Sequence, residues 1–178
     1  MQQSVLDFWF NELKPAQWWA KSARLDAQIT KRFGDLHQAA AAGELFAWRE
    51  TANGRLAEII ILDQFSRHIY RDHARAFATD GMALVLSQTA IEQGVDHELT
   101  QPQKMFLYMP FMHSESLLIQ NRAVTLFGQA NVSNSLRIAQ RHQEIIARFG
   151  RFPHRNHCLG RTSSAEEVAF LQEPNSSF

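Results

Sequence analysis

The stretch NGRLAEIIILDQFSRHIYR, residues 53–71, decides the fold because its apolar residues recur at the spacing of an α-helix. This spacing places Ile61, Leu62, Phe65 and Ile69 on one arc. The alternation of polar and apolar residues that a half-buried strand requires is absent. The stretch therefore predicts a helix that begins near Asn53 and buries one face in a core.

A polar stripe runs along the other side of this predicted helix. Asp63, Arg67 and Arg71 follow one another at intervals of four, with Gln64 beside them. Ile60 lies inside the stripe, which indicates that this side also faces protein and that its charges must be paired. Two interpretations stay open: an ion pair between Asp63 and Arg67 that joins neighbouring helices, or one wall of a polar pocket.

Further helices are predicted on both sides of this stretch. They lie near residues 4–14, 22–43, 77–94, 100–110, 114–127, 132–150 and 163–172, and most begin at a Ser or Thr cap or end at Gly or Pro. Trp18 and Trp19 are expected to fill the core. The chain is therefore predicted to be all-α, with about eight helices paired as antiparallel hairpins in a TPR-like (tetratricopeptide-like) superhelix, although no strict repeat of that type is present.

The totals favour one helical domain. It is expected to cover residues 1–178, with disorder confined to a tail at 173–178. Cys158 is the single cysteine and cannot form an internal disulfide. No signal-peptide pattern is visible, and the longest apolar runs are far shorter than a membrane span. These features predict a soluble cytoplasmic protein with no membrane partner.

The formal net charge is zero, but the charges are unevenly distributed. The segment from Ser116 to Arg161 holds arginines at positions 122, 137, 141, 148, 151, 155 and 161 and a single acid, Glu144. This basic segment either packs against the acidic parts of the chain or binds an anionic ligand. Nucleic acid is disfavoured as a partner, because exposed aromatic residues do not alternate with the arginines.

A second polar cluster occupies MPFMHSES, residues 109–116. Pro110 removes a backbone donor and is expected to break the helix, which places His113, Ser114 and Glu115 near the start of the next one. Ser114 then acts as an N-cap with Glu115 in the first turn. Alternatively, His113 and Glu115 form an acid/base pair or bind a metal.

The third cluster is the loop RFPHRNHCLGRTSS, residues 151–164. It leads into a helix whose capping box is either Ser163 with Glu166 or Ser164 with Glu167. The loop either clamps an oxyanion or carboxylate, or fastens the last helix to the rest of the protein. The hydrogen-bond donors that would do so are Arg151, His154, Arg155, Asn156 and Arg161.

Metal or thiol chemistry is not expected in this loop. His154, His157 and Cys158 do not have the paired spacing of zinc ligands, so no metal site is predicted. Cys158 and His157 are adjacent in the chain, and adjacent residues rarely orient to share a proton, which disfavours a cysteine nucleophile.

Motifs in all three clusters resemble those of a bacterial family catalogued as domain of unknown function 924. The matching stretches are DFWF, LDQFSRHIYR, ARAFATD, FLYMPFMHSES, IQNRAVTLF and RFGRFPHRNHCLGRTSSAEEVAFL, which span nearly the whole chain. The resemblance implies an all-helical fold of the tetratricopeptide-like superfamily and brings no settled activity. The positions that fit the family pattern are Asp63, Gln64, Phe65, Arg67, Ile69, Tyr70, Arg71, His113, Ser114, Glu115, Gln120, Arg122, Pro153, His154, Arg155, Asn156, Gly160 and Arg161.

The sequence departs from the family pattern at several positions. Pro is usual where Ser66 stands, Asn where His68 stands, and Ser where Ala123 stands. His157 and Cys158 occupy variable positions, which further weakens zinc or thiol chemistry built on them.

The leading interpretation is a binding module with one polar pocket for a small anionic or peptide-like ligand. Its predicted ligand-binding residues are Asp63, Gln64, Arg67, Arg71, His113, Glu115, Arg122, His154, Arg155, Asn156 and Arg161. Catalysis stays open, and the first alternative is a hydrolase in which His113 or His154 is the general base beside Asp63 or Glu115. The second alternative is a tetratricopeptide-like scaffold that binds other proteins in a groove. No cofactor is predicted, and nothing indicates an oligomeric state.

Overall fold

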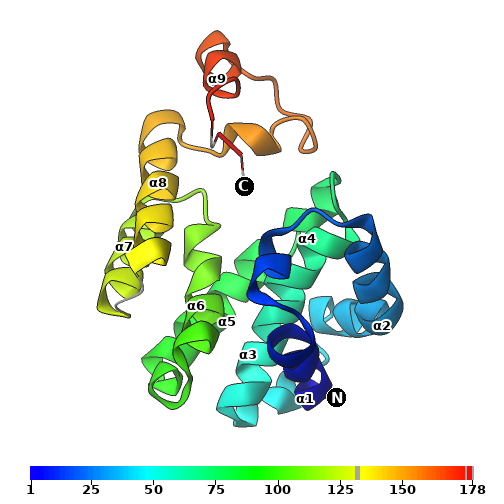
Figure 1. Ribbon diagram of the computed structural model, residues 1–178. Coiled ribbons are helices and arrows are strands. Elements are labelled where there is room, and N and C mark those ends of the chain that lie inside the picture. Colours follow the sequence, from blue (N-terminus) through cyan, green and yellow to red (C-terminus); the bar gives the residue numbers. More distant parts are fainter. Residues whose placement is uncertain (131–132, 175, 178) are drawn as a thin grey trace.

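The computed structural model describes residues 1–130, 133–174 and 176–177, and every regular element within them is a helix (Figure 1). The α-helices are α1 (Gln2–Leu6), α2 (Ala23–Ala41), α3 (Ala52–Ile60), α4 (Ser66–Ile69), α5 (Asp80–Glu92), α6 (Gln101–Met112), α7 (Leu117–Gln129), α8 (Ser133–Phe149) and α9 (Ala165–Phe170). Two π-helical segments, η1 (Asp7–Glu12) and η4 (Ile61–Phe65), continue α1 and α3. Short 3-10 segments lie at η2 (Pro15–Trp19), η3 (Phe46–Glu50), η5 (Ala74–Phe77), η6 (Val95–Glu98) and η7 (Pro153–Arg155). The prediction of an all-α fold is confirmed.

Most helix ends lie where the sequence predicts them. The hydroxyl of Ser22 accepts the N–H of Leu25 at the start of α2, and Ser164 with Glu167 forms the capping box of α9. Gly94 follows α5 in the left-handed region, with φ 73°, where a larger side chain would be strained. Local hydrogen bonding and backbone freedom therefore fix these ends.

The N-terminal region differs from the prediction in two places. The first helix begins at Gln2 rather than at Ser4, whose hydroxyl donates to a backbone carbonyl instead of capping. Trp18 packs against the core as expected, and its indole N–H donates to the carbonyl of Trp9 at 2.8 Å. Trp19 is 58% exposed, so its predicted burial is wrong.

The connection between α6 and α7 also differs from the prediction. α6 contains Pro110 and continues to Met112, so the predicted helix break at this proline is wrong. The turn therefore comes later, and Ser116 rather than Ser114 is the N-cap of α7. The predicted start of the next helix at Val132 lies outside the described residues.

The larger hydrophobic core surrounds α3 and η4. Ile61, Leu62 and Phe65 from the predicted arc are fully buried. Trp9 meets Phe65 and Phe106 edge-on, with ring centres 5.5 and 5.4 Å apart. A second, smaller core joins α8 to the C-terminal segment and consists of Ile145, Ile146, Phe152 and Phe170.

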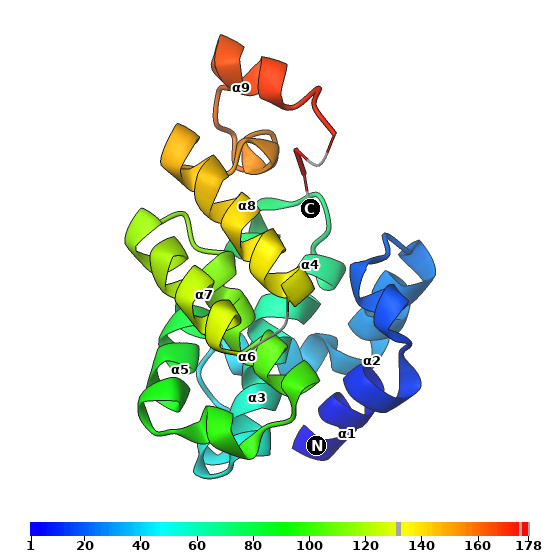
Figure 2. The same ribbon diagram turned by 60° about the vertical axis from the view of Figure 1, so that its left-hand side comes forward.

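Helices that follow one another in sequence pack together in the second half of the chain. α6 contacts α7 and α7 contacts α8, as Figure 2 shows. α3 lies against α1, α5 and α6. Both views place α9 at the end of the molecule opposite to α1 (Figures 1 and 2). The C-terminal segment therefore sits over one end of the helices formed by the rest of the chain.

Several expectations are left as predictions. These are the tetratricopeptide-like superhelix and the extent of the single domain. The predicted disordered tail at 173–178 falls partly on residues 175 and 178, which lie outside the described residues. Within the part of the chain that the structure covers, no helix is both long and apolar enough to cross a bilayer.

Candidate functional site

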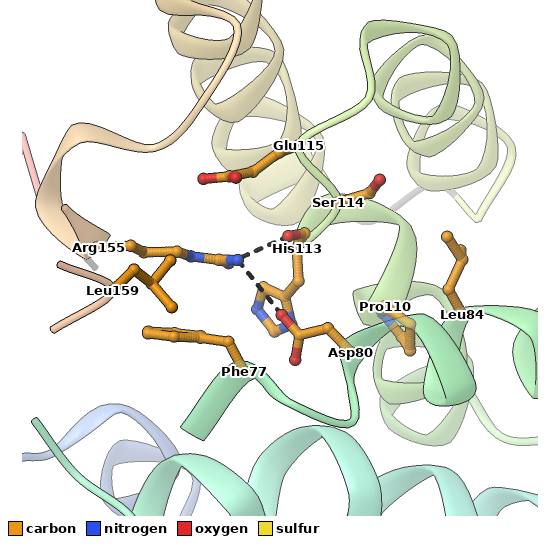
Figure 3. Close-up of a pocket in the computed structure, with 9 residues that line it drawn as sticks. All are labelled: Phe77, Asp80, Leu84, Pro110, His113, Ser114, Glu115, Arg155 and Leu159. Carbon is orange, nitrogen blue, oxygen red and sulfur yellow. Dashed lines mark hydrogen bonds and ion pairs between the residues drawn. The ribbon is translucent and has the colours of Figure 1, made fainter. Parts of the chain in front are cut away.

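A pocket of about 300 Å³ lies where three parts of the chain meet (Figure 3). The region around the start of α5, the junction of α6 with α7, and the segment before α9 supply its lining residues, which are Phe77, Asp80, Leu84, Pro110, His113, Ser114, Glu115, Arg155 and Leu159. The pocket therefore joins the second and third polar clusters of the sequence, and the first cluster reaches it through a contact with His113.

Asp63 makes this contact from the π-helical segment η4. Its carboxylate is 1% exposed, and it accepts the Nδ1–H of His113 at 2.7 Å and the side-chain amide of Gln64 at 2.6 Å. Burial alone would raise the pKa of Asp63, but His113 and Arg67 reverse this effect and hold the pKa below its usual range. Because the ionised carboxylate can only accept, it fixes a proton on Nδ1 of His113.

Arg67 connects Asp63 to Asp80. It lies 3.3 Å from Oδ1 of Asp63 and donates to the two carboxylate oxygens of Asp80 at 2.9 and 3.0 Å. Ile60 is fully buried, as expected if the polar stripe faces protein. The ion pair suggested by the sequence is therefore present, and Asp80 continues it into the wall of the pocket.

Arg155 reaches the pocket from the C-terminal segment (Figure 3). Its guanidinium donates to Asp80 at 3.3 Å and to the backbone carbonyl of His113 at 3.1 Å. The guanidinium carbon lies 4.5 Å from the ring centre of Phe77 and 4.6 Å from that of Phe152. Burial and the charge of Arg67 lower the pKa of Arg155 to about 10, so the side chain stays charged at neutral pH.

Glu115 is paired with Arg161 rather than with His113. Arg161 donates to its two carboxylate oxygens at 2.7 and 2.9 Å, and the backbone N–H of Phe152 donates to it at 2.8 Å. Arg161 also donates to the side-chain oxygen of Asn156 at 2.9 Å. The acid/base pair suggested for His113 and Glu115 does not form, because His113 bonds to Asp63 and Glu115 bonds to Arg161.

Positive and negative charges balance in this network. Its charged members are Arg67, Arg155, Arg161, Asp63, Asp80 and Glu115. Burial and Arg67 lower the pKa of His113, so this side chain adds no charge at neutral pH. Because each buried charge has an opposite neighbour, the network stabilises the docking of the C-terminal segment as well as shaping the pocket.

Of the predicted ligand-binding residues, His113, Glu115 and Arg155 line the pocket, and Arg71 and Arg122 lie away from both the pocket and its ionic network. Arg71 donates to Asp26 of α2 at 2.6 and 2.8 Å, and His68 bonds to the same carboxylate at 2.7 Å. Arg122 is exposed on α7. The structure therefore divides the predicted stripe in two. Asp63 and Arg67 join the network beside the pocket, whereas Arg71 forms a separate ion pair with Asp26 of α2.

His154 and Arg151 belong to the packing of the C-terminal segment. The ring of His154 lies 5.7 Å from that of Phe152, and burial with the charge of Arg155 lowers the pKa of His154 to about 3. Arg151 donates to Glu167 at 2.6 and 2.8 Å. Neither histidines nor acids form a group of three suited to a metal ion within the described residues.

Asp80 is the charged pocket residue that sequence reasoning missed, because its position indicated only a helix start, and the apolar lining residues Phe77, Leu84 and Leu159 were missed as well. A signal was nevertheless available in the sequence. The three clusters supply the arginines of the network but only two of its carboxylates, Asp63 and Glu115. A buried arginine requires an acidic partner, so a third carboxylate had to come from outside the clusters.

The fold and the pocket define an all-helical protein with a charge-balanced site at a junction of three chain segments. Residues 5–175 match the family described as "Bacterial protein of unknown function (DUF924)", and the chain belongs to this family. It is also similar to a solved structure of a protein of unknown function, ATU0120 from Agrobacterium tumefaciens, with a TM-score of 0.92, 38% identity and 97% of each chain covered. None of the curated proteins compared with the chain matches it. The family resemblance is confirmed, whereas the tetratricopeptide-like superfamily stays a prediction.

Proposed function

We propose that the protein binds a small peptide-like ligand in this pocket. The observation that carries the proposal is the kind of polar atom in the lining. Asp80 and Glu115 contribute carboxylate oxygens, and His113 contributes the ring nitrogen that is not bonded to Asp63. Apart from the guanidinium of Arg155 and the hydroxyl of Ser114, the polar side chains of the lining present these acceptor atoms, which suit a ligand that carries N–H groups.

The rest of the lining is apolar and suits a hydrocarbon part of the same ligand. The apolar lining residues are Phe77, Leu84, Pro110 and Leu159. A volume of about 300 Å³ lies at the lower end of the range for small-molecule pockets. The combination favours an amino-acid amide or a short peptide.

The geometry supports the peptide-like class more strongly than a free anion. Arg155 already donates to Asp80, and Arg161 already holds Glu115 by two hydrogen bonds. An incoming anion would have to displace one of these carboxylates from its arginine. A ligand with N–H groups can instead bond to the remaining acceptor positions of the same carboxylates. A protein-binding scaffold stays an alternative prediction.

A thermal-shift comparison of two ligand classes tests the proposal. One class contains amino-acid amides and dipeptides, and the other contains phosphate, nucleotides and dicarboxylates. A ligand present at 100 times its dissociation constant adds about 2.7 kcal/mol to the free energy of unfolding. We expect a saturable rise in melting temperature with the first class.

Leu159→Trp provides the matched pocket variant. Leu159 lines the pocket without belonging to the ionic network, so a larger side chain should fill the space and abolish the shift. Leu118→Trp is the control, because Leu118 is 76% exposed on α7. The proposal fails if neither amides nor dipeptides raise the melting temperature, or if Leu159→Trp responds to them as the unaltered protein does.

A further inference from the structure

Asp63 and His113 have the arrangement of a general base held by a carboxylate. Nδ1 of His113 donates to Asp63 at 2.7 Å, and Gln64 and Arg67 hold the same carboxylate from 2.6 and 3.3 Å. A buried carboxylate in this position orients an imidazole and stabilises the proton that the ring gains during a reaction. The lone pair of the second ring nitrogen, Nε2, is therefore left unprotonated.

Nε2 of His113 is available to a molecule in the pocket. It has no hydrogen-bond partner within the described residues. His113 lines the pocket, and 15% of its side chain is exposed. The charged groups around the ring are Asp63, Arg67 and Asp80, and burial with Arg67 lowers the pKa of His113. A neutral imidazole at neutral pH can take a proton from water.

Arg155 places a fixed positive charge in the same pocket. It donates to the backbone carbonyl of His113 at 3.1 Å, which sets its position relative to the imidazole (Figure 3). Its Nε is buried and has no hydrogen-bond partner in the described part of the chain, so Arg155 acts on the pocket through its charge rather than through this donor. A cation held in this way stabilises the negative charge that develops on a carbonyl oxygen under attack by water.

We infer that the pocket hydrolyses an amide bond in a small peptide-like substrate, with His113 as the general base. This inference rests on the proposed binding function. Nε2 takes a proton from a water molecule while the water oxygen bonds to the carbonyl carbon, and the π electrons of the carbonyl move onto its oxygen beside Arg155. The carbonyl then re-forms, the C–N bond breaks, and His113 returns the proton to the leaving nitrogen. One water is consumed, and a carboxylic acid and an amine are released.

Glu115 and His154 are less suited to the role of base. The two oxygens of Glu115 accept hydrogen bonds from Arg161, and one of them also accepts the N–H of Phe152. Burial would raise the pKa of Glu115, but Arg161 and that N–H hold it below its usual range. His154 is not part of the pocket lining. His113 is therefore the base that the geometry selects from the predicted candidates.

The test uses amino-acid amides and dipeptides as substrates in water enriched in heavy oxygen, with the products followed by mass spectrometry. One labelled oxygen is expected in the released carboxylate, because the attacking oxygen comes from water. His113→Gln should lower kcat by about 10²- to 10⁴-fold, the usual contribution of a general base. His97→Gln is the matched control and should leave kcat unchanged, because the side chain of His97 is 83% exposed.

The pH profile separates catalysis from a structural effect. The rate should fall toward acid as His113 becomes protonated, and this fall should move to lower pH in Asp63→Asn, because the carboxylate that favours the protonated ring is gone. Asp63 is a positioning residue, so its substitution should lower kcat more than it changes KM. If His113→Gln does not fold, the profile of the unaltered protein still decides, since a rate that stays constant down to the pH at which the protein unfolds overturns the inference.

Binding of the same compounds distinguishes this inference from the proposed function. A compound that raises the melting temperature but is not hydrolysed overturns catalysis and leaves the binding function in place. Hydrolysis that continues undiminished in His113→Gln also overturns the inference. If no amide or dipeptide raises the melting temperature or reacts, both proposals fail.

Discussion

Replacing Arg155 with alanine is expected to lower the free energy of unfolding by about 3–5 kcal/mol, because the change breaks a buried ion pair from one side. Arg155 is 6% exposed, and it bonds to Asp80 at 3.3 Å and to the carbonyl of His113 at 3.1 Å. Asp80 would keep Arg67 as a partner, which limits the loss. The carbonyl of His113 would lose its donor, which accounts for about 1–3 kcal/mol of this total.

The aromatic contacts of Arg155 account for another part of this loss. Its guanidinium carbon lies 4.5 Å from the ring centre of Phe77 and 4.6 Å from that of Phe152. Each such contact contributes about 0.5–2 kcal/mol, depending on how far it is removed from water. Alanine would also leave a space between the two rings. In a chain of this size, a loss of 1 kcal/mol lowers the melting temperature by about 2–4 °C, so a fall of roughly 10 °C is expected.

Urea unfolding followed by far-ultraviolet circular dichroism measures this difference directly. Arg122→Ala is the matched control, because Arg122 is exposed on α7, and it should change stability by less than about 0.5 kcal/mol. A loss below about 1 kcal/mol for Arg155→Ala, or equal losses for the two variants, would refute the reasoning that the ionic network fastens the C-terminal segment.

Three other predictions concern stability. Gly54→Ala should destabilise the fold by more than about 2 kcal/mol, because its added Cβ would lie 2.0 Å from the carbonyl oxygen of Trp48. Gly34→Ala should stabilise the fold by about 0.5–1 kcal/mol, since Gly34 lies within α2 with open space around it. Thermal unfolding measures both variants, and a higher melting temperature for Gly54→Ala or a lower one for Gly34→Ala would contradict these predictions. Burial lowers the pKa of His142 and His154 to about 3, so between pH 6.5 and 5 the unfolded chain binds protons that the folded chain does not. The free energy of unfolding should therefore fall by about 1.4 kcal/mol for each of these histidines per unit that the pH is lowered across this range. Urea titrations at several pH values measure this slope, and a flat profile across this range would count against it.

The sequence predicts the helices well because their ends depend on nearby residues. Gly94 and the capping box of Ser164 with Glu167 act within one turn of chain, so their effect can be read from local sequence. Pro110 shows the limit of this reasoning, because α6 continues past it to Met112. Cap and breaker residues therefore mark the positions at which a helix is able to end, but they do not decide at which of these positions it ends.

The partners in the site depend on distant residues and could not be predicted in the same way. Asp63 and Arg67 lie on the pocket side as their spacing suggests, whereas Arg71 follows the end of α4 at Ile69 and turns toward Asp26. The helical wheel places Arg71 on the same stripe only while the helix continues. The tertiary fold alone decides which carboxylate meets which arginine.

The contacts that close the pocket join parts of the chain that are made at different times. Asp80 and Arg155 are 75 residues apart, and Glu115 and Arg161 are 46 residues apart. Contacts between distant residues form late in folding, because closing a long loop costs entropy before any contact rewards it. During synthesis, helices α1 to α7 leave the ribosome before either of these arginines does. A nascent chain can therefore pack these helices while it still lacks the pocket, whose lining is complete only once Arg155 and Leu159 have emerged.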